Sequence, residues 1–494
     1  MAVNELQSLL AEITGEESTP GNDQAGWPPP GAESQPPGAS RRPAAPVREH
    51  ELSGSGPVHE SAIAAVDIPD QGADEKKFLP EAPETLVEAG LSESELGALI
   101  LKYLLSNAAA SGATISRGLA LPFPIVAKHM KLLKAEQLVA IKSASQLQDL
   151  VYELTPQGKE QAHSHLDRCT YCGAAPVPLD QYTKGVNAQS LSRCPPTFRD
   201  LERAFADITL SDEMLRRLAR AIYHGKGLFL HGLPGNGKTS MAERVTKAYG
   251  QTIWIPRMIS AFGEIIQLYD PSLHVEVPLT SGKSIAQGRQ IDRRWVRIRR
   301  PTIVVGGELT LENLEITFRK ESGLSEAPIQ LKSNCGTLVI DDFGRQRVSP
   351  ADLLNRWIVP LEKRYDFLNL KSGRKIRVPF EQFVVFSTNL EPKDLVDEAF
   401  LRRIPYKIEA KDPSEEQFRG LFLSTAQRMN VAVSGDALEH LLAQHYRSSG
   451  RSFRFCHPRD LLHQVCVYCA LQGTAPVMTQ QAIDAAAGDY FCVL

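Results

Sequence analysis

The stretch Gly232-Leu233-Pro234-Gly235-Asn236-Gly237-Lys238-Thr239 matches G-x-x-x-x-G-K-[ST], the pattern of a loop that holds nucleotide phosphates. The apolar run 226–231 before it predicts a short strand, and residues 240–245 after it predict the start of a helix. A phosphate loop needs both neighbours. The sequence therefore predicts an α/β fold built around a site for ATP or GTP.

Each residue type in this loop has an expected task. The glycines let the backbone turn so that several N–H groups point inward, and the following helix adds the positive end of its dipole. Lys238 is expected to reach the β- and γ-phosphates, and the Thr239 hydroxyl is expected to bind Mg²⁺. The predicted nucleotide site comprises Gly232, Leu233, Pro234, Gly235, Asn236, Gly237, Lys238, Thr239 and Ser240.

The bulk composition is that of a folded protein with several domains. The chain has 494 residues, of which 42% are hydrophobic and 23% charged, with a net charge of −3. This balance gives no general signature of nucleic-acid binding, although a local basic patch would not show in it. The N-terminus lacks the features of a signal peptide, and no apolar run is long enough to span a bilayer, so a cytoplasmic protein is expected.

The N-terminal region, residues 1–79, is predicted to be mostly disordered. Residues 1–18 have the pattern of a short amphipathic helix, which would serve either as a docking peptide or as a frayed, solvated helix. From Thr19 to about Glu75 the chain is rich in Pro, Gly, Ser and Ala. Such a segment cannot bury enough apolar surface to fold, so it is expected to be a linker.

Residues 80–166 have the pattern of a small folded domain. Apolar stripes predict helices around 96–104, 114–119 and from Pro124, and two strands follow at 138–142 and 150–154. Three helices and a β-hairpin resemble the winged-helix family. The segment 152–159 resembles that family's last strand and closing helix.

The third helix of a winged helix often enters the DNA major groove. Here it carries Lys128, His129, Lys131 and Lys134. Lysines on a surface helix are more often only a solvated face, and winged helices also dock proteins. Binding of duplex DNA and docking of a protein both remain open from the sequence.

Residues 167–200 are predicted to be a connector. It contains Cys169 and Cys172, a spacing that can bind zinc if further ligands complete the site. The second pair, Cys466 and Cys469, lies in a predicted helix. With eight cysteines in the whole chain, reduced structural cysteines are the favoured interpretation.

Two further apolar runs end in polar residues that suit ATP hydrolysis. Residues 337–340 are followed by Asp341 and Asp342, and residues 382–388 are followed by Asn389. A buried parallel strand would place these groups beside the phosphate loop. Asp341 would hold Mg²⁺ and Asp342 would orient the attacking water. Asn389 would either position that water or only form a turn at the strand end.

Together these motifs resemble the AAA+ ATPase family over roughly residues 200–494. The resemblance implies a P-loop NTPase core at 201–411 and an α-helical lid at 412–494. It assigns Gly232–Thr239 as Walker A, Asp341 and Asp342 as Walker B, and Asn389 as sensor 1. Arg402 or Arg403 would be the arginine finger that acts on a neighbouring subunit's nucleotide, and Arg459 would be sensor 2. Many family members have Glu where this chain has Asp342, which suggests slower hydrolysis.

The segment between the two Walker motifs is long and β-rich. Residues 293–300 and 302–307 are predicted to be strands of an insertion, and the region 262–269 fits either helix or strand. The arginines around Trp295 would form either a surface for nucleic acid or acidic protein, or a charged edge strand. A hairpin from 366–370 to 375–378 resembles the pre-sensor 1 insertion of MoxR-type AAA+ ATPases.

Two functions therefore compete. The leading one is a MoxR-like AAA+ ATPase that uses ATP and Mg²⁺, assembles as a ring, expected to be a hexamer, and remodels a protein partner. The alternative is an ATP-dependent DNA-binding regulator or a protein similar to helicase loaders. A structural protein that binds ATP without hydrolysing it is less favoured, because each hydrolytic position has a suitable residue. No membrane association is expected.

Overall fold

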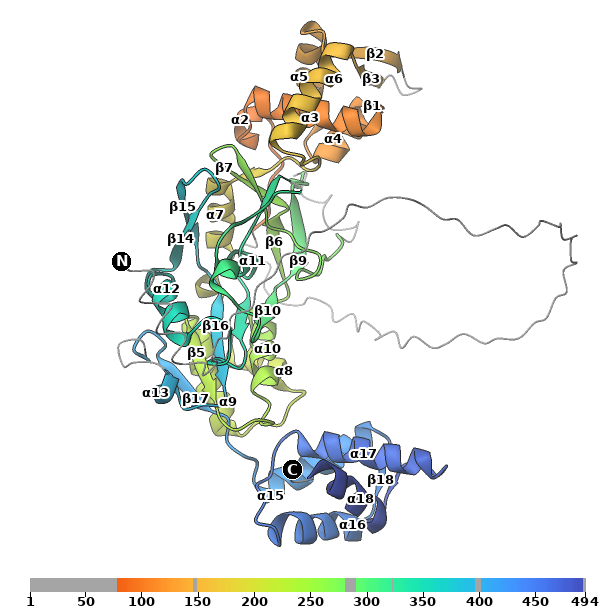
Figure 1. Cartoon of the computed structure of the whole chain (residues 1–494), viewed down its shortest axis with the longest axis vertical. Coiled ribbons are helices and arrows are strands. Elements are labelled where there is room, and N and C mark those ends of the chain that lie inside the picture. Colours follow the sequence, from red (N-terminus) through yellow and green to blue (C-terminus); the bar gives the residue numbers. More distant parts are fainter. Residues whose placement is uncertain (1–77, 145–148, 280–289, 322, 396–400, 492–494) are drawn as a thin grey trace, which may run out of the picture. The chain divides into compact units, whose positions relative to one another are not determined.

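The computed structural model describes residues 78–144, 149–279, 290–321, 323–395 and 401–491 (Figure 1). The predicted N-terminal helix at 1–18 and the predicted linker that follows it lie outside these residues. None of the peptide bonds between the described residues is cis.

The first described region combines short helices with a three-stranded antiparallel sheet. The sheet has the order β1-β3-β2. The helices and strands predicted for 80–166 are confirmed, and a short additional strand, β1, lies between the first two predicted helices. The elements are α2 (Leu86–Ala89), α3 (Glu93–Asn107), β1 (Ala109–Ser111), α4 (Gly112–Leu119), α5 (Phe123–Ala135), β2 (Val139–Ala144), β3 (Leu150–Leu154) and α6 (Pro156–Arg168).

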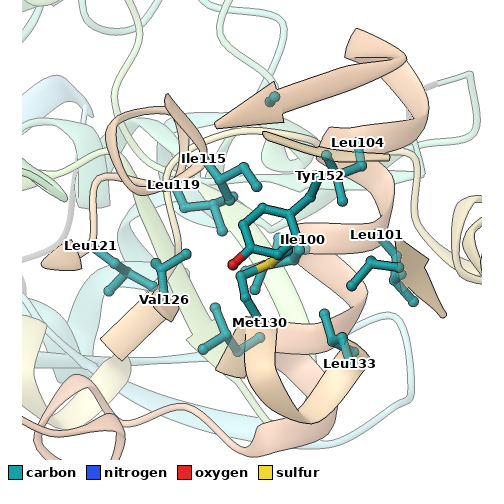
Figure 2. Packing of buried hydrophobic residues seen from close by; sticks show 14 of the residues in the cluster. Ile100, Leu101, Leu104, Ile115, Leu119, Leu121, Val126, Met130, Leu133 and Tyr152 are labelled. Carbon is teal, nitrogen blue, oxygen red and sulfur yellow. The ribbon is translucent and has the colours of Figure 1, made fainter. Parts of the chain in front are cut away.

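One apolar core holds this region together. Ile100, Ile115 and Met130, from three different helices, are fully buried and pack with Tyr152 of β3 (Figure 2). Gly158 allows α6 to approach the hairpin, because a Cβ at this position would lie only 1.9 Å from the Leu138 carbonyl oxygen. The closing helix is therefore fixed against the hairpin by close backbone packing.

The segment 167–200, predicted as a connector, contributes a strand and a helix to the next part of the fold. Strand β4 (Val177–Pro178) pairs in parallel with β7 (Met258–Ala261), and helix α7 (Leu179–Ala188) follows it directly. Tyr182 of α7 is 1% exposed and belongs to the core of the inserted β region. Its hydroxyl accepts a hydrogen bond from Asn334 Nδ2 at 2.8 Å. The segment is thus an integrated part of the β region.

A five-stranded parallel sheet contains the strand that leads into the predicted phosphate loop. Its order is β10-β13-β16-β5-β17, so the strand before the phosphate loop lies between the Asn389 strand and β17. The strands are β5 (Gly227–His231), β10 (Thr302–Val305), β13 (Thr337–Ile340), β16 (Phe383–Thr388) and β17 (Tyr406–Glu409). Thr302–Val305 therefore belongs to this sheet, and its predicted placement in the insertion is wrong.

Helices cover both faces of this sheet (Figure 1). Along β16, Val385 faces the core shared with the phosphate-loop helix, while Val384 and Phe386 face the core shared with Trp357. This alternation explains why the strands have continuous apolar runs. One face packs on α8 (Phe198–Phe205), α9 (Asp212–His224) and α10 (Lys238–Val245), which continues into η2 (Thr246–Tyr249), and the other packs on α12 (Pro350–Lys363).

Most strands between the phosphate loop and Asp341 form a separate β-rich region. A second five-stranded sheet has the order β11-β12-β8-β7-β4, and β6 pairs with β9 beside it. The predicted hairpin is also present as β14 and β15, and it shares the apolar core of the insertion. The bounds are β6 (Thr252–Pro256), β7 (Met258–Ala261), β8 (Glu264–Gln267), β9 (Trp295–Arg299), η3 (Leu311–Leu314), β11 (Thr317–Arg319), β12 (Leu324–Glu326), α11 (Ile329–Lys332), β14 (Tyr365–Asn369) and β15 (Lys375–Pro379).

Arg293 and Arg299 of the arginine-rich stretch 293–300 are exposed, whereas its other arginines are partly or fully buried. Trp295 is 6% exposed, and Arg294 is 1% exposed with its guanidinium paired to Asp292 at 2.8 Å. The strand is not an edge, because β6 pairs with one side and residues 275–277 bond to the other. The edge-strand interpretation is therefore wrong, whereas a binding surface that includes the exposed Arg293 and Arg299 stays a prediction.

The C-terminal region is helical, as predicted for residues 412–494, and has its own apolar core. Its elements are α15 (Glu415–Arg428), β18 (Ala432–Val433), α16 (Gly435–His440), the π-helical segment η4 (Leu441–Arg447), α17 (His457–Leu471), β19 (Val477–Met478) and α18 (Gln480–Tyr490). A short helix, α13 (Pro392–Leu395), precedes β17. Within the described residues, no helix combines the length and apolar composition needed to cross a bilayer.

Candidate nucleotide-binding site

The predicted site residues meet at one edge of the parallel sheet. Thr388 of β16 is in register with His231 of β5, and Ile340 of β13 is in register with Phe386 of β16. The residues that follow these strands therefore emerge together beyond their carboxyl ends. In open parallel sheets this edge is where ligands bind.

The phosphate loop has the backbone conformation expected from its glycines. Gly235 and Gly237 have φ angles of 84° and 72°, in the left-handed region that favours glycine. Helix α10 begins at Lys238 with Gly237 as its N-cap, and no side chain occupies that cap. The loop and the helix N-terminus thus leave backbone N–H groups available for an anion.

Lys238 is a buried cation without a carboxylate in hydrogen-bond contact. Lys238 is 7% exposed. Its ammonium donates hydrogen bonds to the carbonyl oxygens of Gly232 at 2.9 Å and Leu233 at 3.0 Å. The third hydrogen bond goes to Asn389 Oδ1 at 2.7 Å. Burial lowers the pKa of Lys238, while the nearby carboxylates of Asp341 and Asp342 raise it. All three direct partners are neutral, so a phosphate would add the missing negative charge.

Thr239 and Asp341 form the second contact of the site. The Thr239 hydroxyl donates to Asp341 Oδ2 at 2.8 Å. These oxygens come from the first turn of α10 and from the end of β13, beside the phosphate loop. Hydroxyl and carboxylate oxygens are the ligands that Mg²⁺ prefers, so this pair fits the predicted metal ligands.

Asn389 joins the lysine to the second acid of the site. Its amide nitrogen donates to Asp342 Oδ1 at 3.0 Å, while its amide oxygen accepts from Lys238. Asp342 is exposed and has a φ of 48°, a strained conformation that Asp tolerates better than most residues. Asp342 is thereby held at the mouth of the site.

A residue of the C-terminal region that the sequence analysis missed also reaches the loop. Arg454 pairs with Asp412, whose Oδ1 accepts a hydrogen bond from Asn236 Nδ2 at 2.7 Å. The Cys456 backbone N–H donates to the Gly235 carbonyl at 3.0 Å. A Cβ on Gly235 would lie 2.6 Å from Cys456 Sγ, so the loop glycine permits this close approach.

Arg459, the predicted sensor 2 residue, lies elsewhere. Its side chain is 75% exposed and pairs with the adjacent Asp460 at 3.0 Å. The positive charge of Arg454, by contrast, contributes to lowering the pKa of Lys238. The structure therefore places Arg454, and not Arg459, beside the phosphate loop.

Arg402 and Arg403, the two candidates for the arginine finger, lie at the amino ends of the strands, whereas the phosphate loop lies at the carboxyl ends. Arg402 and Arg403 precede β17 and line a surface pocket of about 440 Å³ with Lys226, which precedes β5. Because β17 runs parallel to β5 for four residues, this edge is about 13 Å from the carboxyl edge. Arg403 pairs with Glu362 at 2.7 Å, whereas Arg402 is exposed. Neither arginine meets the phosphate loop of its own chain.

The cysteine pairs show no zinc cluster within the described residues. Seven described cysteines are free, and the groups of three potential metal ligands found there include none of them. Cys172 is exposed and Cys469 is buried, so the cysteines differ in environment.

Comparison with known proteins gives one family match, confined to the C-terminal region. A family model described as a domain of unknown function (DUF8689) matches residues 414–488. No curated protein matches the sequence of the chain significantly.

Two solved structures illustrate the similarity of the backbone. NtrX from Brucella abortus is 13% identical, with a TM-score of 0.36 over 57% of this chain and 56% of NtrX. The RuvB Holliday junction branch migration motor of Thermotoga maritima is 12% identical, with a TM-score of 0.32 over 56% of this chain and 68% of RuvB. The chain thus spans little more than half of NtrX.

Proposed function

We propose that this chain is an ATPase of the AAA+ class that binds ATP with Mg²⁺ and hydrolyses it to ADP and phosphate. The observation that carries the proposal is the linked set Lys238–Asn389–Asp342 beside the Thr239–Asp341 pair. A site that binds a nucleotide without hydrolysing it needs only the phosphate loop and its lysine. The additional acid and amide are the groups that hydrolysis requires.

Each group has a role in the proposed reaction. Lys238 and the N-terminus of α10 bind the phosphates, and Thr239 and Asp341 hold Mg²⁺, which supplies neutralising charge to the phosphates. Asp342 orients the water and accepts a proton as the water attacks. Asn389 fixes the carboxylate of Asp342 through the 3.0 Å hydrogen bond and thereby sets the position of that water.

The site is complete only with a second copy of the chain. Because Arg402 and Arg403 lie at the edge of the sheet away from their own phosphate loop, either would act on the nucleotide of a neighbouring subunit. Arg402 is the better candidate, since Arg403 is already paired with Glu362. This geometry supports the proposal of a ring, with a hexamer as the expected state.

The work done with ATP is proposed to be the remodelling of a protein partner, as in MoxR-like proteins. The hairpin β14–β15 supports this, because one face is anchored while the other is available. Leu368 and Ile376 are buried in the core of the insertion, whereas Phe367 is 48% exposed. A rigid hairpin with an exposed aromatic residue is suited to contact a substrate.

Binding of duplex DNA is the second candidate function, and the proposed winged-helix domain at 80–166 carries it. Lys128, Lys131 and Lys134 of α5 are all exposed, while His129 is 6% exposed and cannot contact DNA readily. Burial also lowers the pKa of His129, which removes its charge near neutral pH. Three exposed lysines on one helix would contact phosphates and give salt-dependent binding.

ATP turnover with and without duplex DNA, at low and moderate salt, separates these functions. We expect turnover that is indifferent to DNA, because the exposed lysines are few and the net charge is negative. Stimulation by DNA that fades with salt, and that is lost in a Lys128→Ala/Lys131→Ala variant, would instead favour the DNA-dependent function. Absence of any ATP turnover by the assembled protein would contradict hydrolysis itself.

Arg454→Ala is expected to weaken ATP-dependent function, whereas Arg459→Ala should have little effect. Loss of a charge-assisted contact near the phosphates costs about 1.5–3 kcal/mol, or roughly 10- to 100-fold in ATP affinity or turnover. Nucleotide titration and steady-state phosphate release on both variants measure this. The reverse ranking of the two variants would restore Arg459 as the sensor residue.

A further inference from the structure

The C-terminal region contains a cluster of potential metal ligands that the nucleotide chemistry does not use. His440 Nε2 and His445 Nε2 lie 2.8 and 2.6 Å from the same atom, Asp484 Oδ1. One ligand atom from each residue lies within 4.8 Å of the others, and no second such group occurs among the described residues. The three side chains converge from α16, η4 and α18.

The π-helical segment explains how the two histidines share one face. In an α-helix, neighbours on a face are three or four residues apart, so positions five apart diverge. In η4 the backbone hydrogen bonds join residues five apart, which places His440 and His445 one turn from each other. π-Helical turns within helices are frequently found at functional sites.

The framework behind the cluster is rigid. Leu441 and Leu442, which follow His440, are fully buried, and Ile483, which precedes Asp484, is also fully buried. The helices therefore fix the positions from which the three side chains extend. The side chains themselves are reachable, with exposures of 24% for His440, 22% for His445 and 47% for Asp484.

We propose that His440, His445 and Asp484 bind a divalent transition-metal ion, with Zn²⁺ preferred. Two imidazole nitrogens and one carboxylate oxygen are a ligand set that Zn²⁺ accepts, with water completing a tetrahedral coordination. The ion would take the place of the N–H hydrogens that now lie between each ring and the shared oxygen. Ligand atoms would move apart by a few tenths of an ångström, which exposed side-chain ends permit.

Such an ion would join the α16–η4 unit to α18. It would stabilise the C-terminal region, since an ion that binds only the folded form shifts the unfolding equilibrium toward the native state. The segment matched by the family of unknown function, residues 414–488, contains all three ligands. This role is independent of ATP hydrolysis, so it stands or falls separately from the proposed function.

Calorimetric titration of the metal-free full chain with Zn²⁺ tests the proposal. We expect one site whose affinity falls roughly 100-fold or more in His445→Ala, beyond the 10- to 100-fold cost of losing a ligand's hydrogen-bond partner. His463→Ala is the matched control, because His463 is an exposed histidine of α17 in the same region. Zn²⁺ should also raise the melting temperature of the wild type and of His463→Ala, but not that of His445→Ala.

A Cys169→Ser/Cys172→Ser variant distinguishes this site from the exposed cysteine pair. Retained binding in that variant, together with loss in His440→Ala and His445→Ala, would support the His–His–Asp site. Absence of Zn²⁺ binding by the wild type would overturn the proposal. Binding that both histidine variants retain, or that the cysteine variant loses, would overturn it equally.

Discussion

Lys238→Ala is expected to reduce ATP turnover by roughly 100- to 10,000-fold. Lys238 is the one cation of the loop, and each charge-assisted hydrogen bond to a phosphate contributes about 1.5–3 kcal/mol. Loss of two such bonds in the transition state corresponds to about 3–6 kcal/mol, and each 1.36 kcal/mol is a factor of ten in rate. Steady-state phosphate release by the assembled protein measures the loss.

The matched control is Lys247→Ala. Lys247 lies in η2, close in sequence to the loop, but its side chain is 60% exposed and only 3.8 Å from Asp207 in a surface pair. Such pairs contribute little, so turnover should stay near the wild-type rate. Full turnover in Lys238→Ala would show that the loop does not hold ATP for hydrolysis, and the proposed function would fail.

The Lys238→Ala protein should remain folded. Its ammonium is buried, and its partners in the chain are neutral oxygens, so removal leaves no unpaired charge in the interior. The circular dichroism spectrum and melting temperature should therefore change little. This makes the loss of turnover a statement about chemistry and not about folding.

Local sequence patterns were enough to predict the centre of this site. The loop, Asp341 and Asn389 each follow a short apolar strand, and parallel strands necessarily bring their carboxyl ends to one edge. The contacts of Thr239 with Asp341 and of Asn389 with Lys238 follow from that arrangement. These side chains could be placed from the sequence because each lies within a residue or two of the end of its strand or helix.

The position of Arg454 beside the loop and the proposed site of His440, His445 and Asp484 could not be predicted from a local sequence pattern. Arg459 follows a Pro at the start of α17, a position that resembles that of a sensor 2 arginine. The path of the chain before α17, however, brings Arg454 close to Gly235. His440 and His445 are five residues apart, a spacing that an α-helical pattern places on different faces. Only the π-helical backbone of η4 brings them together.

The pairing of the strand around Trp295 is another feature that the local sequence pattern does not determine. Alternating arginines predict an exposed face for strands with one solvated side. Here residues 275–277 bond to the edge of the strand that β6 leaves free, and Asp292 neutralises the buried Arg294. The pairing with residues 275–277 is a tertiary effect that the local pattern does not show, whereas Arg293 and Arg299 are exposed as the pattern predicts.

Arg402→Ala is expected to lower turnover by about 1,000-fold or more while ATP binding is retained, since an arginine finger supplied by a neighbour contributes 10³- to 10⁵-fold to kcat. The effect falls on kcat because the finger contacts charge that develops in the transition state. Arg403→Ala is the comparison that decides between the two residues. Its loss removes the pair with Glu362, so we expect a lower melting temperature and a smaller loss of turnover.

A mixing experiment tests whether Arg402 acts between subunits. Lys238→Ala subunits have an inactive loop but an intact finger, whereas Arg402→Ala subunits have an active loop without a finger. In a mixed assembly, some interfaces combine the active loop of one subunit with the finger of the other. Turnover should therefore recover partly on mixing, although each variant alone is inactive. If Arg402 acted within its own chain, mixing could not restore activity, because every subunit would lack either the lysine or the arginine of the same site.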